Sequence, residues 1–270
     1  MRECTLRKPF SYRVGFKTTP GATLADLLAF EAALPDNLNA VAFVVQDVGL
    51  TTQLYHTDIY TVAVPWSVFP GDCPNTAMSP VNSARNRLRY VDTRLAGALF
   101  DAVVLTNECA WPSAEYYRDW TLEALEGCDE RGWTCITHVW NAGTPDLDWL
   151  PVLDDVHCEM EARGHYYGSN IYPVDDLPLM SREGIAPYTT WRHEMIMERM
   201  RCSPEWAITE LAPGYGFGPP AVQDTARYLK ATQGLFALVG VWYYSPIPTP
   251  IGPDANWVFE DMLNLAGELQ

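Results

Sequence analysis

Residues 101–112 read DAVVLTNECAWP, a short apolar run that ends on the polar pair Asn107 and Glu108. A continuous run of β-branched residues and leucine is typical of a strand that is covered on both faces. Seven other segments share this character, each followed by a loop rich in Pro, Gly, Asn or Asp. The eight predicted strands occupy residues 12–17, 40–47, 59–66, 101–107, 134–140, 166–172, 206–210 and 238–244.

The segments between these strands repeat apolar residues at helical spacing, as Leu88, Val91 and Leu95 do. Only residues 49–58 are too short and polar for more than a turn or two. Regular alternation of strand and helix implies a parallel sheet, and residues 18–21, TTPG, lack the glycine spacing of a nucleotide-binding open sheet. We therefore predict an α/β fold, a single (β/α)8 TIM barrel over residues 1–270.

Composition and charge exclude several partners. The 34 acidic against 18 basic residues give a net charge of −16, which repels phosphate backbones and anionic membranes, so we expect no nucleic-acid or membrane partner. No stretch has the length and hydrophobicity of a membrane span or the form of a signal peptide, which predicts a cytoplasmic protein. The seven cysteines are odd in number and form no CxxC pair, so we predict reduced thiols, with neither a disulfide framework nor a metal site.

Two glutamates close predicted strands, Glu108 the fourth and Glu210 the seventh. The carboxyl ends of barrel strands meet at one face, where TIM-barrel enzymes carry their active sites. An ionised glutamate after an apolar run must reach solvent, a partner or a ligand. Alone, each could cap a helix or pair with a surface arginine. Together they favour glycoside hydrolysis, which uses two carboxyl groups across one cleft.

The sequence resembles a large clan of retaining glycoside hydrolases, the GH-A-like (β/α)8 barrels, whose catalytic glutamates end strands four and seven. Asn107 with Glu108 is similar to the clan's Asn-Glu acid/base pair, and residues 208–210, ITE, are similar to its nucleophile motif. The resemblance implies hydrolysis of a β-glycosidic bond by retaining double displacement, without a cofactor. Glu108 would then be the acid/base, Glu210 the nucleophile, and Asn107 a partner of the sugar 2-hydroxyl.

Other strand ends extend the same resemblance. Residues 170–173, NIYP, resemble the strand-six segment whose tyrosine hydrogen-bonds the nucleophile, which implies that Tyr172 orients Glu210. Trp242 resembles the aromatic floor beneath the sugar, although barrel packing is the alternative. Lys17 is the candidate for the basic residue that some families carry on strands one to three. The other residues predicted to bind substrate are Trp66, Trp111, His138, Trp140, Asn141 and Asn170.

The predicted partner is therefore a carbohydrate substrate, and the oligomeric state is left open. A lone histidine such as His138 is more often a structural residue than a ligand contact. A different class of function also stays open, a non-catalytic carbohydrate-binding barrel. In that case the aromatic side chains would bind sugar while the carboxylates would be misplaced for catalysis.

Overall fold

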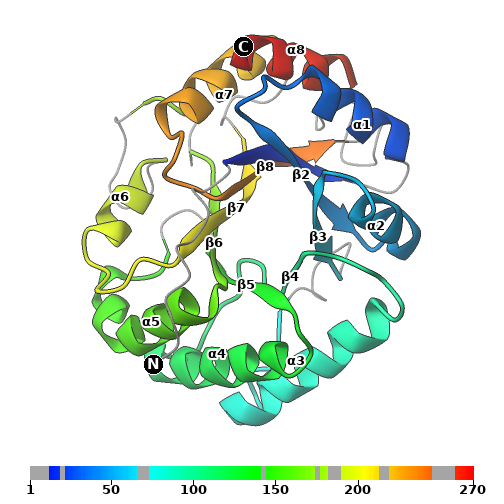
Figure 1. Cartoon of the computed structure of the whole chain (residues 1–270). Coiled ribbons are helices and arrows are strands. Elements are labelled where there is room, and N and C mark those ends of the chain that lie inside the picture. Colours follow the sequence, from blue (N-terminus) through cyan, green and yellow to red (C-terminus); the bar gives the residue numbers. More distant parts are fainter. Residues whose placement is uncertain are drawn as a thin grey trace, which may run out of the picture.

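The computed structural model describes residues 12–18, 22–65, 73–140, 144–173, 177–181, 190–212, 219–244 and 259–270, with only the backbone for residues 242–244 and 259. Eight parallel strands close into one barrel in the order β1 to β8, and the helices surround it (Figure 1). The predicted (β/α)8 TIM barrel is confirmed.

The strands are β1 (Arg13–Thr18), β2 (Asn39–Val45), β3 (Tyr60–Val64), β4 (Ala102–Val104), β5 (Thr134–Trp140), β6 (Tyr166–Ile171), β7 (Glu205–Leu211) and β8 (Leu238–Tyr244). The α-helices are α1 (Leu24–Ala33), α2 (Val48–Tyr55), α3 (Pro80–Arg94), α4 (Ala114–Asp129), α5 (Asp154–Arg163), α6 (Arg192–Met197), α7 (Pro219–Ala231) and α8 (Phe259–Leu269). A 3-10 helix, η1 (Leu147–Leu153), precedes α5.

Strand β4 is shorter than predicted, whereas helix α2 has the predicted length. Strand β4 ends at Val104, because the chain beyond it follows β5 only through separate bonds, from Leu105 N to the Ile136 carbonyl at 2.9 Å and from Glu108 N to the Val139 carbonyl at 2.8 Å. Helix α2 spans eight residues, about two turns, which agrees with the turn or two expected there. Asp47 caps it by accepting a 2.8 Å hydrogen bond from Leu50 N.

The apolar residues form two layers. Val41, Phe43 and Ile136 belong to the cluster that fills the barrel, whereas Phe16 and Tyr117 belong to the layer between the strands and the helices. The strands read as continuous apolar runs because both of their faces are buried. Inside the barrel Gly240 is required, since a Cβ there would lie 2.7 Å from the Phe43 ring.

The cysteines correct the sequence prediction. Cys73 is bonded to Cys109 and Cys158 to Cys202, with Cα–Cα distances of 5.4 and 5.0 Å. The prediction of reduced thiols is wrong for these four, because their partners lie 36 and 44 residues apart and meet only in the folded chain. Disulfides persist in oxidising compartments, so the cytoplasmic prediction loses the support that it drew from reduced thiols. Among the described helices, none combines the length and apolar character needed to cross a membrane.

Candidate active site

One amide joins the two predicted catalytic glutamates. The Asn170 Nδ2 atom donates to Glu108 Oε1 at 2.8 Å and to Glu210 Oε2 at 3.2 Å. Since both distances share one nitrogen atom, these two carboxylate oxygens lie at most about 6 Å apart, the range of paired catalytic carboxylates. The fold therefore brings Glu108 and Glu210 together at the carboxyl ends of the strands.

The Asn170 side chain is held in one orientation. It is buried on β6, where Asn170 is the register partner of Glu210 on β7. The Thr209 hydroxyl donates to Asn170 Oδ1 at 2.5 Å, which turns the amide nitrogen toward the carboxylates. A third acceptor, Asn107 Oδ1, lies 3.3 Å from the same nitrogen. Three acceptors thus share two amide protons, which ties β6, β7 and the chain after β4 into one polar cluster.

Glu210 also pairs with a buried cation. The Lys17 ammonium on β1 donates to Glu210 Oε1, and each side chain is only 5% exposed. Burying an ion pair removes both charges from water, and the loss of either partner leaves an uncompensated charge. Lys17 was predicted to bind substrate, but the structure places its ammonium group on the candidate nucleophile.

Glu108 has an unusual backbone and a different partner. Its φ of 53° lies in the left-handed region, which is unfavourable for a residue with a Cβ atom. The Tyr172 hydroxyl donates to Glu108 Oε1, which corrects the prediction that Tyr172 orients Glu210. The two oxygens of Glu210 accept from Lys17 and Asn170 instead.

The Tyr172 hydroxyl stays a proton donor. Burial raises its pKa above the ordinary value near 10, and the hydrogen bond to Glu108 and the negative charges of Glu108 and Glu210 raise it further. The phenol is therefore neutral at physiological pH and donates to Glu108.

Three predicted substrate-binding residues lie elsewhere. His138 and Trp140 are buried against Tyr117 of α4, with ring centroids 4.8 and 4.9 Å away, in the layer between the barrel and the helices. The register of β5 shifts between Thr137 and Trp140, and His138 has a φ of 71°. Strict alternation of side chains fails there, and both His138 and Trp140 pack against Tyr117. Trp111 is half-buried and packs 4.5 Å from the Tyr117 ring.

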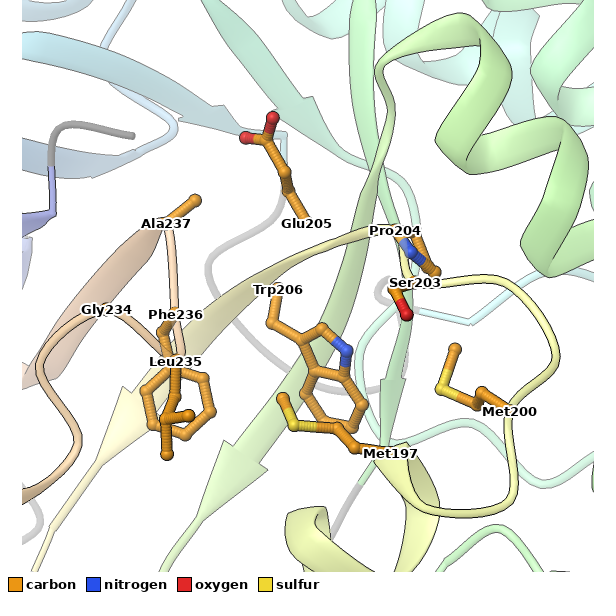
Figure 2. Close-up of a pocket in the computed structure, with 10 residues that line it drawn as sticks. All are labelled: Met197, Met200, Ser203, Pro204, Glu205, Trp206, Gly234, Leu235, Phe236 and Ala237. Atoms are coloured by element: carbon orange, nitrogen blue, oxygen red, sulfur yellow. The ribbon is translucent and has the colours of Figure 1, made fainter. Parts of the chain in front are cut away.

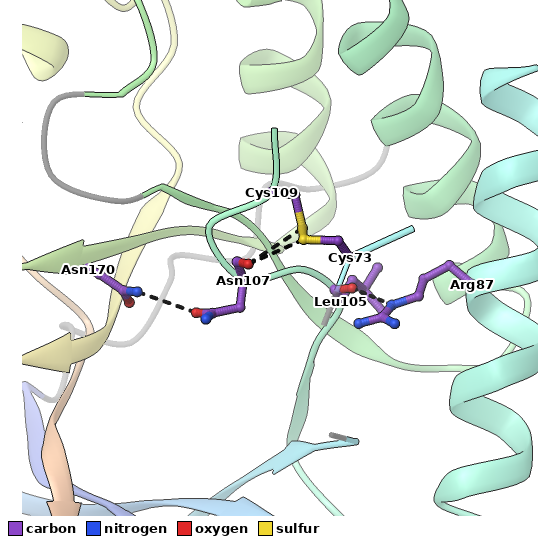
Figure 3. Close-up of a disulfide and its surroundings, with 6 residues drawn as sticks. All are labelled: Cys73, Arg87, Leu105, Asn107, Cys109 and Asn170. Carbon is purple, nitrogen blue, oxygen red and sulfur yellow. Dashed lines mark hydrogen bonds between the residues drawn. A yellow bond between two sulfur atoms is a disulfide. The ribbon is translucent and has the colours of Figure 1, made fainter. Parts of the chain in front are cut away.

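The remaining predictions cannot be placed. Trp66 and Asn141 lie outside the described residues, as does the Trp242 side chain, although the Trp242 backbone belongs to β8. Sequence reasoning missed Arg87, whose guanidinium is buried and donates to the Leu105 carbonyl at 2.6 Å (Figure 3). The available signal was a charged residue on the apolar face of the helix, next to Leu88.

One pocket among the described residues lies away from the cluster of Glu108, Glu210 and Asn170. It has a volume of about 240 Å³ and lies at the amino ends of β7 and β8, where Met197, Trp206 and Phe236 line it (Figure 2). Glu205, which starts β7, also lines this pocket, whereas Glu210 lies near the other end of the strand. Within the described ranges, no group of three or more His, Cys, Asp or Glu side chains is arranged to hold a metal ion.

Comparison with known proteins adds structural neighbours only. No family model matches the chain, and no curated protein does. Among solved structures, XacCel5A in complex with cellopentaose matches with a TM-score of 0.53 and 13% identity over 97% of this chain and 100% of that one. The endo-β-1,4-glucanase Xac0029 from Xanthomonas axonopodis pv. citri matches with a TM-score of 0.51 and 12% identity, over 96% and 99%.

The barrel shares its fold with glycoside hydrolases. A third neighbour, the catalytic domain of GH30 xylanase C from Talaromyces cellulolyticus, has a TM-score of 0.50 and 10% identity over 87% of this chain and 68% of that one. The (β/α)8 architecture predicted from the sequence is thus the architecture of these solved glycoside hydrolases, and no family is assigned. At these identities the likeness concerns the fold, and any activity must be argued from the side chains.

Proposed function

We propose that this protein is a glycoside hydrolase that cleaves β-linked oligo- or polysaccharides with retention of configuration. The observation that carries the proposal is the single Asn170 amide that bonds both Glu108 and Glu210. Retaining enzymes hold their carboxyl groups about 5 to 5.5 Å apart, and inverting enzymes about 6.5 to 9.5 Å. The upper limit of about 6 Å between the bonded oxygens favours retention.

The surroundings of the two glutamates support different roles. The Lys17 ammonium stabilises the negative charge of Glu210, as a nucleophile requires. The described hydrogen bonds to Glu108, from Tyr172 and Asn170, both end on Oε1. The other oxygen, Oε2, would carry the proton that an acid catalyst must donate. This contrast favours Glu210 as nucleophile and Glu108 as acid/base.

In the first step, a Glu210 oxygen would attack the anomeric carbon while the bond to the leaving oxygen breaks and Glu108 gives that oxygen its proton. The product is a covalent glycosyl-enzyme. In the second step, Glu108 takes a proton from water, the resulting hydroxide adds to the anomeric carbon, and Glu210 leaves as a carboxylate. Because Asn170 contacts both glutamates, it would hold the donor and the nucleophile at a fixed separation.

The choice of substrate follows from the neighbours and the charge. XacCel5A was solved with cellopentaose, and another neighbour is an endo-β-1,4-glucanase. A chain with net charge −16 favours a neutral glycan over an anionic one. We therefore propose β-glucan oligosaccharides as the first substrates to test, followed by mannans and xylans.

The decisive experiment measures hydrolysis of these glycans and of activated aryl β-glycosides, with the anomer released first identified by NMR. Glu210→Gln should abolish turnover of every substrate. Glu108→Gln should lower kcat/KM strongly on oligosaccharides and least on activated aryl glycosides, whose leaving group needs no proton. A matched control is Glu205→Gln, which alters the same strand at its opposite end and should keep wild-type rates.

Three results would overturn the proposal. Initial release of the inverted anomer would refute the retaining mechanism. Equal losses in the Glu108 variant on activated and unactivated substrates would refute its role as an acid. Glycan binding without hydrolysis by the wild-type protein would show a non-catalytic sugar-binding barrel.

A further inference from the structure

The acid/base residue is directly followed by a disulfide. Cys109 is the residue after Glu108, and it is bonded to Cys73, which lies in the segment before α3. The two sulfur atoms lie 3.6 and 3.5 Å from the Asn107 carbonyl oxygen (Figure 3). Because oxidised sulfur carries no proton, these are packing contacts. The bridge therefore packs on the residue before Glu108 and is bonded to the residue after it.

The chain around Glu108 needs such a brace. Strand β4 has already ended at Val104, so regular sheet pairing no longer holds this segment. Glu108 has a left-handed φ of 53°, a conformation that costs of the order of 1 kcal/mol or more in a residue with a Cβ atom unless its surroundings enforce it. A free chain would relax from it, and the carboxyl group would move with the backbone.

The other restraints act on the same segment from the barrel side. The Arg87 guanidinium holds the Leu105 carbonyl at 2.6 Å. The Val139 carbonyl accepts from Glu108 N at 2.8 Å, and Asn170 reaches Asn107 Oδ1 at 3.3 Å. All of them act at or before Glu108. On the far side, helix α4 begins only at Ala114, so the Cys73–Cys109 bridge is the covalent restraint between Glu108 and that helix.

We propose that the Cys73–Cys109 disulfide is a positioning device that fixes the Glu108 carboxyl group for proton transfer. This inference rests on the proposed function. When the bridge is cut, residues 107–109 relax, and the proton donor leaves its place beside Asn170 and the leaving oxygen. The loss falls on steps that need acid catalysis and spares the nucleophile, because Glu210 is held separately by Lys17.

The second disulfide supplies a matched control. Cys158 lies on α5 and Cys202 in the connection between α6 and β7, both outside the barrel. This bridge closes a loop of similar length, 44 residues apart compared with 36 for the first. By the entropy of loop closure, removing either bridge should lower thermal stability by a similar amount. Only removal of the first should change catalysis selectively.

The test compares Cys73→Ser/Cys109→Ser with Cys158→Ser/Cys202→Ser. We measure kcat/KM, which reports the steps through release of the leaving group, on a β-glucan oligosaccharide and on an activated aryl glycoside. The first variant should lose at least tenfold on the oligosaccharide and less than threefold on the aryl glycoside. The control should stay within twofold of wild type on both.

Reducing the folded Cys158→Ser/Cys202→Ser protein repeats the test. It does not require the Cys73→Ser/Cys109→Ser protein to fold. Dithiothreitol supplies two electrons and two protons to the remaining Cys73–Cys109 bridge and becomes a cyclic disulfide. Mass spectrometry after alkylation of the free thiols measures the fraction of protein in which this bridge is open. The same selective loss should follow and reverse on reoxidation. Full oligosaccharide activity after opening, or equal losses on both substrates, refutes the positioning role alone. A wild-type protein that hydrolyses neither substrate refutes the proposed function and this inference with it.

Discussion

Replacing Asn170 by aspartate should separate the shared amide from every other feature of the site. The change keeps the shape of the side chain but turns a donor to two carboxylates into a third carboxylate. At the 3.2 Å contact with Glu210, the proposed carboxylate nucleophile, two unit charges repel by about 5 kcal/mol when the effective dielectric constant is about 20. Asn170→Ala removes the donor without adding charge, and hydrogen bonds to charged groups are worth about 1.5 to 3 kcal/mol each.

These magnitudes set an order of activities. Losing both bonds predicts that Asn170→Ala lowers kcat/KM on oligosaccharides by about 10²- to 10⁴-fold, at about 1.4 kcal/mol for each factor of ten. Asn170→Asp should fall at least a further tenfold, because repulsion spreads Glu108 and Glu210 apart. Initial-rate kinetics give the order, and thermal unfolding shows whether the barrel is intact. Asn264→Asp makes the same chemical change on the exposed side of α8 and should leave kcat/KM unaltered.

Either of two results would refute the role of the Asn170 amide in holding Glu108 and Glu210. If Asn170→Asp matched Asn170→Ala while both proteins stayed folded, the amide would not contact a charged carboxylate during turnover. If Asn170→Ala kept kcat/KM within threefold of wild type, the separation of the two carboxylates would be set by something other than this contact.

Three further changes test the site and the barrel. Lys17→Met should lose turnover and about 3 to 5 kcal/mol of unfolding free energy in urea, because it strands a buried carboxylate; unchanged stability would contradict the ion pair. Burial lowers the pKa of His157 in the folded protein to about 4. Above pH 6.5 the histidine is neutral in both the folded and the unfolded protein, so its full contribution to the free energy of unfolding is present. As the pH falls from 6.5 toward 4, the unfolded chain binds the proton first, and the free energy of unfolding decreases by about 3 kcal/mol. His157→Phe should flatten that acid dependence in urea titrations at pH 7.5 and 4.5, and an equal slope would refute it. Gly15→Ala would put a methyl group 1.6 Å from a β2 carbonyl oxygen, so we expect circular dichroism to show an unfolded protein. Gly267→Ala on α8, with open space around it, should raise the free energy of unfolding by about 0.5 to 1 kcal/mol. A folded, stable Gly15→Ala protein would contradict the packing.

The sequence by itself determined the barrel and the two carboxylates. Eight apolar runs alternating with amphipathic segments leave few architectures, because each strand needs cover on both faces. A glutamate that directly follows such a run is costly to bury without a partner. Glu108 and Glu210 could therefore be identified as candidate catalytic residues from their sequence neighbours alone. These inferences need only neighbouring residues.

What each side chain contacts was decided by the tertiary structure. His138 and Trp140 pack against Tyr117 where the β5 register shifts, and the Tyr172 hydroxyl bonds Glu108, whereas Lys17 and Asn170 bond Glu210. Cys73 reaches Cys109 only once α3 has packed beside α4. Each outcome depends on residues tens of positions apart, at distances of a few ångströms that strand periodicity does not specify.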